Sequence, residues 1–568
     1  MKKLFCVLFL VLTISSCNLE VTLPGLNSSS DNSSQQNPSN GSNSNTDSSE
    51  SSPDASKKFI LQEPSFTTRT INSKDEVTFD DFFNLGNRID VKVYMSNLEM
   101  DKLSDDSNTF INTGGNKSQI YRRANKVTIS LKNGENVFTW DFDNVGIRQK
   151  GNTSRKAIYD GNGNLNNNHF KLSFDETFTD TQMYSPSYIE QYGNQEYDER
   201  EFLNTLSGLD FKWNKNEDVT NIKEIYSSYL YHAGGIMTSH IGLANFSIVE
   251  VDKNNREKDF GLCTVFEPSS KSMIKRAMQS EDKVYVNLPT WDQEKKGTYG
   301  APEEKYGDYY ECGWGRGAGS ASNGADLTTS SINGSQIGIG DISGSYIPAY
   351  ERKSNTSVIG YNDDLLRNLV SVVDSSSSNY QAINEIIDLE EFAIKEGIEY
   401  YLGNPDGMRF NANNYKIYFR RTDGKAMFVP IDTDRCFGII KDWEVKEGLK
   451  ATNPWEETDS QGNVYRNKIF SKTILADTTN AAKQKYIEVI DQIRKSSWVL
   501  DSTFEEFFEK AKATYSERNF SLKDNNYSFS DYINKKNETV DKYLVWNSGN
   551  VSLNTPVGEK HILLWLEY

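Results

Sequence analysis

Hydrophobic and polar residues alternate along the first part of the chain that is rich in apolar side chains. The alternating stretches are 89–95 (IDVKVYM), 126–132 (KVTISLK), 136–142 (NVFTWDF) and 169–176 (HFKLSFDE). A period of two is typical of strands with one buried face. The second and third stretches are separated by Asn-Gly-Glu at 133–135, which is a hairpin signal. This region is therefore predicted to be rich in β-structure.

One stretch in this region has a helical period instead. Residues 217–235 (EDVTNIKEIYSSYLYHAGG) place their apolar side chains on one face, and two glycines end the pattern. Residues 240–252 and 259–268 then predict two strands, and 269–278 a short helix. His232 and His240, at these boundaries, are interpreted as structural residues or as partners of backbone groups at a helix end.

The second half of the chain predicts mostly helices. Residues 280–360 have no clear period and are rich in Gly, Ser and Tyr, which favours a surface loop or lid. Their Tyr and Trp side chains could stack on sugars or form a small satellite core. Helical spacing then returns in five segments: 363–373, 388–403, 481–496, 503–517 and 532–546.

Acidic and amide side chains gather in a predicted hairpin within this second half. The segments GNPDGMRFNANNYKIYF and VPIDTDRCFG contain Asp406, Asn414, Asp432 and Asp434. Strand-like residues and a Thr-Asp-Gly turn at 422–424 lie between them. Asp406 could be only a turn residue in Asn-Pro-Asp-Gly. Asp432 and Asp434 could be surface carboxylates, although alternation puts both on one face beside apolar neighbours.

Composition narrows the choice of function. Of the 568 residues, 36% are hydrophobic and 12% aromatic, enough for a core, and the formal net charge of −18 argues against a nucleic-acid partner. Three cysteines beyond the N-terminal segment are widely spaced, so no disulfide framework is predicted. The four histidines do not lie at zinc-ligand spacing from any cysteine.

The N-terminus has the features of a leader. Met-Lys-Lys precedes a short apolar run that ends in Ser-Ser-Cys at 15–17. This pattern predicts a lipoprotein signal peptide (1–17) with a lipid on Cys17, and the alternative is an ordinary signal peptide with an incidental cysteine. The Ser/Asn-rich run at 18–58 is expected to be a disordered tether. We therefore expect an extracytoplasmic protein, lipid-anchored to the bacterial cell envelope.

The order of polar residues suits phosphoryl transfer from ATP. That reaction needs a cation for the phosphates, oxygen ligands for Mg²⁺ and a carboxylate that orients the acceptor hydroxyl. Asp406, Asn414 and Asp432 could supply the carboxylate and the metal ligands. Lys171, upstream on a predicted strand, could hold phosphates, and the loop Arg-Gln-Lys-Gly-Asn at 148–152 has a glycine that allows close backbone approach. An exposed strand lysine is the alternative for Lys171.

Three blocks of the sequence resemble one known family. They are VGIRQKGNTSR (145–155) with FKLSF (170–174), FGLCTVFEPSSKSMIKR (260–276), and LGNPDG…NNYKIYF…FVPIDTDRCFG (402–438). Together they resemble the spore-coat CotH family of atypical secretory kinases. The resemblance implies an α+β, protein-kinase-like two-lobed fold, with a β-rich N-lobe containing one helix and a helical C-lobe.

The resemblance also implies domain limits and an activity. The kinase-like domain would span 87–545 with the insertion 280–360, preceded by an extension at 59–86 and followed by a segment at 546–568. It would use ATP and Mg²⁺ or Mn²⁺ to phosphorylate Ser or Thr hydroxyls of secreted or cell-surface proteins.

Carried over residue by residue, the resemblance assigns roles. Asp406 would be the catalytic carboxylate, while Asn414, Asp432 and Asp434 would bind or support the metal. ATP would be held by the following residues: Arg148, Lys150, Asn152, Lys171, Glu224 and Glu267. Within that set Glu224 would pair with Lys171, and Glu267 would end a hinge strand beside adenine. Glu224 could instead be a solvated helix charge.

The sequence departs from the family pattern at four positions. Ile431 replaces a usual Trp, Lys150 replaces an Arg, Cys263 stands where a Tyr is common, and Pro405 precedes Asp406. None of these changes removes a catalytic group. A rival interpretation is a non-catalytic surface module for binding or structure, in which the acidic cluster holds Ca²⁺.

Overall fold

A computed structural model describes most of the chain from residue 59 to residue 553. The described ranges are 59–112, 118–151, 154–279, 285–301, 305–317, 324–342, 344–358, 360–377, 379–439, 452–456, 465–476, 481–523, 528–547 and 550–553. The predicted signal peptide, Cys17, the predicted tether, Asn152 and most of the segment 546–568 lie outside these ranges. Among the described residues, no helix is both long enough and apolar enough to cross a membrane.

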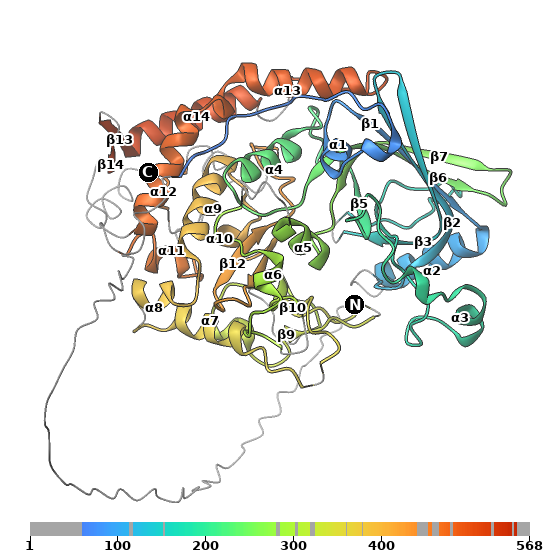
Figure 1. Cartoon of the computed structure of the whole chain (residues 1–568), viewed down its shortest axis with the longest axis horizontal. Coiled ribbons are helices and arrows are strands. Elements are labelled where there is room, and N and C mark those ends of the chain that lie inside the picture. The colour runs from blue at the N-terminus through green and yellow to red at the C-terminus, as the bar shows by residue number, and fades with distance from the viewer. Residues whose placement is uncertain are drawn as a thin grey trace, which may run out of the picture. The chain divides into compact units, whose positions relative to one another are not determined.

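The first half of the described chain forms a closed seven-stranded barrel (Figure 1). Its strands are β1 (Arg88–Met95), β2 (Arg122–Asn133), β3 (Asn136–Lys150), β4 (His169–Ser173), β5 (Gly208–Trp213), β6 (Ile241–Glu250) and β7 (Arg256–Phe266). The order around the barrel is β1-β2-β3-β4-β5-β7-β6. β1 closes the barrel by pairing in parallel with β6, while the other neighbours are antiparallel.

The barrel follows from the alternation of its strands. Every second residue of β1 is buried, which directs one face into the barrel core. The predicted hairpin of β2 and β3 is confirmed, with Asn133 opposite Asn136. The predicted pair 240–252 and 259–268 is confirmed as β6 and β7.

Five helices accompany the barrel strands. They are α1 (Phe79–Phe83), α2 (Asn97–Asn112), α3 (Pro186–Tyr192), α4 (Lys223–Ala233) and α5 (Lys271–Gln279). α1 begins at a capping box between Thr78 and Asp81, which satisfies backbone donors at its N-terminus. The predicted helix at 217–235 is present but shorter, because Asp218 and Thr220 form a turn before α4 begins.

A second, five-stranded sheet combines segments that lie far apart in the sequence. Its strands are β8 (Tyr309–Cys312), β9 (Ile337–Gly338), β10 (Tyr350–Arg352), β11 (Tyr415–Phe419) and β12 (Ala426–Pro430), in the order β12-β11-β8-β10-β9. Three of these strands belong to the stretch 280–360. The expectation of an irregular loop there is wrong, because tertiary pairing with β11 forms strands too short to show a period.

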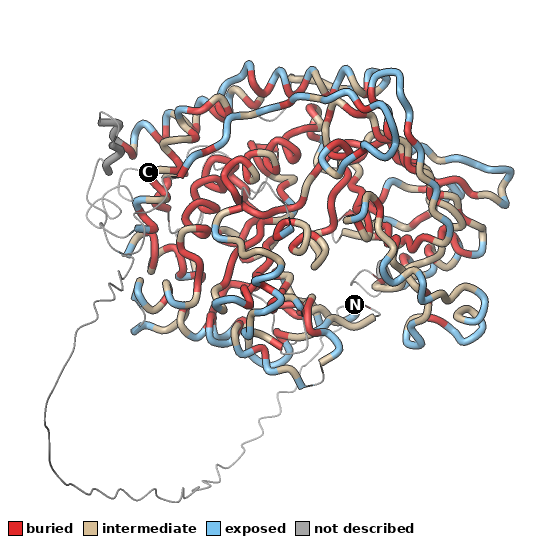
Figure 2. The backbone as a smooth tube through the Cα atoms, in the orientation of Figure 1, coloured by how far each residue is buried: buried red, intermediate tan, exposed pale blue. Residues whose placement is uncertain are grey.

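The described residues of the second half also form nine α-helices. They are α6 (Trp291–Glu294), α7 (Asp364–Asp374), α8 (Tyr380–Asn384), α9 (Leu389–Leu402), α10 (Met408–Asn411), α11 (Ile469–Lys472), α12 (Ala481–Lys495), α13 (Asp501–Thr514) and α14 (Phe529–Tyr543). A short hairpin, β13 (Leu544–Asn547) and β14 (Asn550–Leu553), follows. The backbone of α9 is red almost throughout Figure 2, since nearly all of its residues are buried.

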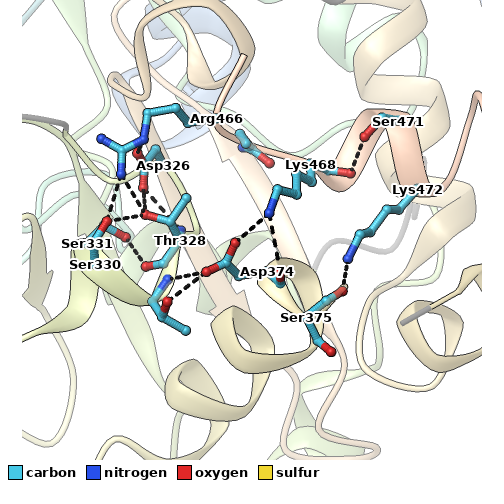
Figure 3. Close-up of polar contacts among 12 residues, drawn as sticks. Asp326, Thr328, Ser330, Ser331, Asp374, Ser375, Arg466, Lys468, Ser471 and Lys472 are labelled. Carbon is cyan, nitrogen blue, oxygen red and sulfur yellow. Dashed lines mark hydrogen bonds and ion pairs between the residues drawn. The ribbon is translucent and has the colours of Figure 1, made fainter. Parts of the chain in front are cut away.

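Polar contacts fix the 324–342 segment to its helical neighbours (Figure 3). Asp374, at the end of α7, accepts hydrogen bonds from the backbone and hydroxyl of Thr329 at 2.9 and 2.7 Å, and it pairs with Lys468 at 2.9 Å. Arg466 pairs with Asp326 at 3.2 Å and donates to Ser330 at 2.7 Å. These contacts hold this part of the insertion against α7 and the segment that leads into α11.

The predicted protein-kinase-like two-lobed fold is wrong. The β-rich half is a closed barrel, and α1, α2 and α3 precede α4 where one helix was expected. The second half has its own five-stranded sheet in addition to helices. Closure of the barrel depends on the parallel pairing of β1 with β6, and strand alternation alone carries no information on such a long-range partner.

Candidate active site

A cleft of about 820 Å³ lies between the outside of the barrel and the second sheet. Its described lining contains ten Lys and Arg side chains and seven Asp and Glu side chains. The whole chain has a formal net charge of −18, whereas the described lining of this cleft has more basic than acidic side chains. An excess of one sign of charge in a cleft attracts ligands of the opposite sign.

The barrel wall of the cleft is a regular grid set by strand register. Arg148, Lys171 and Asp210 lie side by side on β3, β4 and β5. Lys150 lies opposite His169 in the next row, and Lys212 follows Asp210 at a spacing of two. All six side chains line the cleft because residues two apart on a strand share a face.

Lys212 is the most heavily paired residue of the grid. Its ammonium is 2.8 Å from Glu224 of α4, 2.6 Å from Asp432 and 3.1 Å from Asp434, which both follow β12. Its side chain is only 9% exposed, whereas that of Asp432 is 46% exposed. One cation thus joins the barrel, a helix and the second sheet at one point.

The electrostatics of this cluster follow from burial and charge. Burial alone would lower the pKa of Lys212, but Asp432, Asp434 and Glu224 outweigh it and raise that pKa well above its ordinary value. Burial likewise opposes ionisation of Asp432, yet Lys212 lowers its pKa to about 2. Burial raises the pKa of Glu224, and it also raises that of Asp434, where the charge of Asp432 adds to the effect.

Asp406 lies in the cleft lining and also in a turn. Its backbone N–H donates to the Asn404 side chain at 3.0 Å, so the residue takes part in the turn while it also lines the cleft. Its Oδ1 accepts from Asn411 at 2.5 Å and from Asn413 at 3.0 Å. Arg435 Nε is 3.5 Å from Oδ2. Burial raises the pKa of Asp406, although these donors and Arg435 oppose the rise.

Asn414 and Asp432 have left-handed backbone conformations, with φ of 53° and 55°. The backbone N–H of Ile431 donates to the Asn414 carbonyl at 3.1 Å, which ties the two segments together. Non-glycine residues with positive φ cost free energy and are frequent at functional sites. Among the described residues, no group of three or more His, Cys, Asp or Glu side chains is placed to hold a metal ion.

Glu267 lines the cleft but is engaged in a buried cluster. It forms a bidentate pair with Arg276 at 2.6 and 2.8 Å and lies 3.2 Å from the ring of His240. Burial would raise its pKa, but Arg276 lowers it to about 2. The rings of His240 and His232 stack with centroids 4.0 Å apart, and both residues are partly buried.

The structure corrects one predicted pairing. Glu224 is bound to Lys212 and not to Lys171, whose ion-pair partner is Asp210 at 3.9 Å. Lys150 binds the same Asp210 at 2.7 Å. Arg148 donates to the Ser118 carbonyl at 3.1 Å. Arg148, Lys150 and Lys171 therefore line the cleft. Glu224 contacts a cleft residue through its ion pair with Lys212 and not with Lys171.

Sequence reasoning missed Lys212 and Lys416. Lys212 lies in GLDFKW (208–213), a short strand that the pattern analysis did not assign. The spacing Asp-x-Lys just before a helix containing Glu224 was the available signal. Lys416 lies on β11, and only the pairing of β11 with β8 brings it beside Glu311.

The sequence matches no family model and no curated protein. The chemistry of the cleft is therefore argued from its own residues.

Proposed function

We propose that this cleft catalyses ATP- and Mg²⁺-dependent phosphoryl transfer to a protein hydroxyl. The observation that carries the proposal is the position of Lys212, which binds Glu224 of a helix and Asp432 of the facing segment at once. Protein kinases use a strand lysine paired with a helix glutamate, beside an aspartate that holds the metal ion. The proposal depends on these side chains and not on a kinase fold.

The charge of the cleft suits a nucleotide. A triphosphate with its metal ion is an anion, and the lining has more basic than acidic side chains. Lys150, two strands away from Lys212 in the grid, would add a second cation for the phosphates. Arg148 and Lys171 extend the same basic surface.

The residues near Lys212 fit Mg²⁺ as an incomplete ligand set. Mg²⁺ prefers oxygen ligands and keeps several waters, with substrate phosphates completing its coordination. Asp432 is ionised and nearly half exposed, and Asn414 and Asp434 lie in the same lining. These three side chains would hold the ion, which would neutralise charge on the phosphates.

Asp406 would act on the acceptor hydroxyl. As the hydroxyl oxygen bonds to the γ-phosphorus, the bond to the β–γ bridging oxygen breaks and ADP leaves, while the hydroxyl proton passes to Asp406. Asn411 and Asn413 both bind Oδ1, which fixes the carboxylate and leaves Oδ2 to meet the proton. The acceptor would be Ser or Thr of a secreted or surface protein, in keeping with the exported lipoprotein predicted from residues 1–17.

The decisive experiment uses γ-labelled ATP with Mg²⁺ or Mn²⁺ and a generic protein acceptor. Wild-type protein should label the acceptor or itself, and Asp406→Asn and Lys212→Gln should each lose about 100-fold or more. Lys296→Gln, an exposed lysine outside the cleft, is the matched control.

Binding is measured on the same samples. Mg-ATP should raise the melting temperature of the wild type and of Asp406→Asn, since ligand binding stabilises the folded state. A melting temperature that responds to Ca²⁺ alone, with no labelling, would contradict the proposal and favour the Ca²⁺-binding module.

A further inference from the structure

A second part of the cleft, around Arg148 and Lys171 of the grid, has an excess of positively charged side chains. Arg148 and Lys171 of the barrel wall line the cleft together with Lys416 of β11 and Lys353, which follows β10. Burial lowers the pKa of Lys416, and the positive charge of Lys171 adds to the effect. Cations from both walls therefore lie close enough to repel one another.

These four cations face the carboxylates of Glu311, Glu351, Asp210 and Asp175, and Asp175 lines the cleft close to Lys171. Glu311 is shared by Lys416 at 3.3 Å and Lys353 at 3.6 Å. Lys353 also binds Glu351 at 2.7 Å. On the barrel side, Asp210 is bound closely by Lys150 and is 3.9 Å from Lys171.

Arg148 and Lys171 have few hydrogen-bond partners of their own. The Nε of Arg148 is buried and has no hydrogen-bond partner among the described residues. The Lys171 side chain is 26% exposed, and its ammonium is 3.9 Å from Asp210, which is longer than a hydrogen bond. Lys171 thus keeps donors that an anion in the cleft could use, and Arg148, opposite it on β3, adds a second positive charge.

The surroundings of Lys212 are the electrostatic opposite. There, three carboxylates face one ammonium group, so an anion gains nothing without a metal ion. At Arg148, Lys171 and Lys416 the excess is positive, so an anion needs no metal. One cleft therefore contains two places with different requirements.

We propose that Arg148, Lys171 and Lys416 form a second anion subsite, which takes a phosphate group of the acceptor without a metal ion. This inference rests on the proposed function in that the acceptor would lie beside the nucleotide. A phosphate group of the bound nucleotide is the other ligand that these three side chains could take. The test below distinguishes the acceptor phosphate from the nucleotide phosphate.

The test is calorimetric titration of the purified protein with pyrophosphate in EDTA. Wild type should bind, and Lys171→Gln and Lys416→Gln should each weaken binding about 10-fold or more. The exposed control Lys296→Gln should bind as the wild type does. Lys416 also donates to the Ser269 carbonyl at 2.6 Å, so Lys353→Gln, at a 29% exposed position, provides a second variant in case Lys416→Gln unfolds.

A second titration is made in saturating Mg-ADP. Retained pyrophosphate affinity supports an acceptor subsite, and complete competition overturns it in favour of nucleotide phosphate. Absence of binding in EDTA, or equal affinity in the lysine variants, also overturns the proposal. Mg-ADP binding is measured in a separate titration. If the protein does not bind Mg-ADP, the proposed nucleotide site is wrong, while the pyrophosphate result in EDTA still stands.

Discussion

The ammonium of Lys212 on β5 is 2.6 Å from the carboxylate of Asp432, 220 residues later in the chain. This contact joins the barrel to the segment that follows the second sheet. Glu224 and Asp434 complete the cluster, so the lysine serves both to hold two parts of the molecule together and to neutralise acids in the cleft.

Replacing Lys212 by Met should destabilise the protein in a pH-dependent way. Three carboxylates would lose their common cation, which should cost about 1–3 kcal/mol at neutral pH, reduced by the exposure of Asp432. Glu224 and Asp434 already have raised pKa values, and the substitution should raise them further. A carboxyl group with a raised pKa favours the folded state at low pH and disfavours it as the pH rises.

The measurement is the free energy of unfolding at about pH 5 and about pH 8. The deficit of the variant should be smaller at the lower pH, because protonation removes the repulsion. Lys92→Met, which breaks an exposed pair with Glu257, should cost less than about 1 kcal/mol. An equal deficit at both pH values would contradict the electrostatic explanation.

The pH dependence of labelling should report the environment of Asp406. Its pKa is raised by burial, and it must be ionised to accept the hydroxyl proton. The rate should therefore fall as the pH drops, with a midpoint above the ordinary Asp value of about 3.9. Arg435→Gln should move this midpoint to higher pH, because a cation that favours the ionised form is lost. A midpoint that does not move would remove Asp406 from this role.

The contacts of Asp374 predict how firmly the 324–342 segment is held. Asp374→Asn should cost about 1–2 kcal/mol of unfolding free energy, since it removes charged bonds to Thr329 and Lys468. The pKa of Asp374 is lowered to about 2, and the largest cause is the hydrogen bond from the backbone N–H of Thr329. The difference between variant and wild type should therefore be complete above the ordinary Asp pKa of about 3.9 and shrink as the pH falls from there through about 2. Chemical denaturation at several pH values measures it.

A substitution at Gly307 tests whether the insertion pairs with β11. A Cβ at this position would lie 1.8 Å from the carbonyl oxygen of Phe419. Gly307→Ala should therefore separate the beginning of β8 from β11 and cost about 1–3 kcal/mol or more. Gly161→Ala, where the added carbon meets nothing within 4 Å, should leave the melting temperature unchanged. Equal melting temperatures for both variants would contradict the described sheet.

The sequence predicted local features better than long-range ones. The hairpin of β2 and β3 and the strands β6 and β7 follow from alternation and turn residues, which act between near neighbours. Asp406, Asn414 and Asp432 are close in the sequence, and all line the cleft. By contrast, the Lys212 cluster and the closure by β6 depend on contacts between distant segments, so residue pattern alone could not assign them.

The central place of β8 in the second sheet has a consequence for how the chain folds and how it can be shortened. β8 pairs with β11 on one side and β10 on the other, so β11 and β12 alone would be a two-stranded hairpin with an open edge. Such hairpins are marginal in water, and exposed edges invite association between chains. The wall that presents Lys416 and Asp432 therefore forms only when strands more than a hundred residues apart pair with each other. Deleting 280–360 as a dispensable loop should therefore give an aggregating protein and not a smaller folded one.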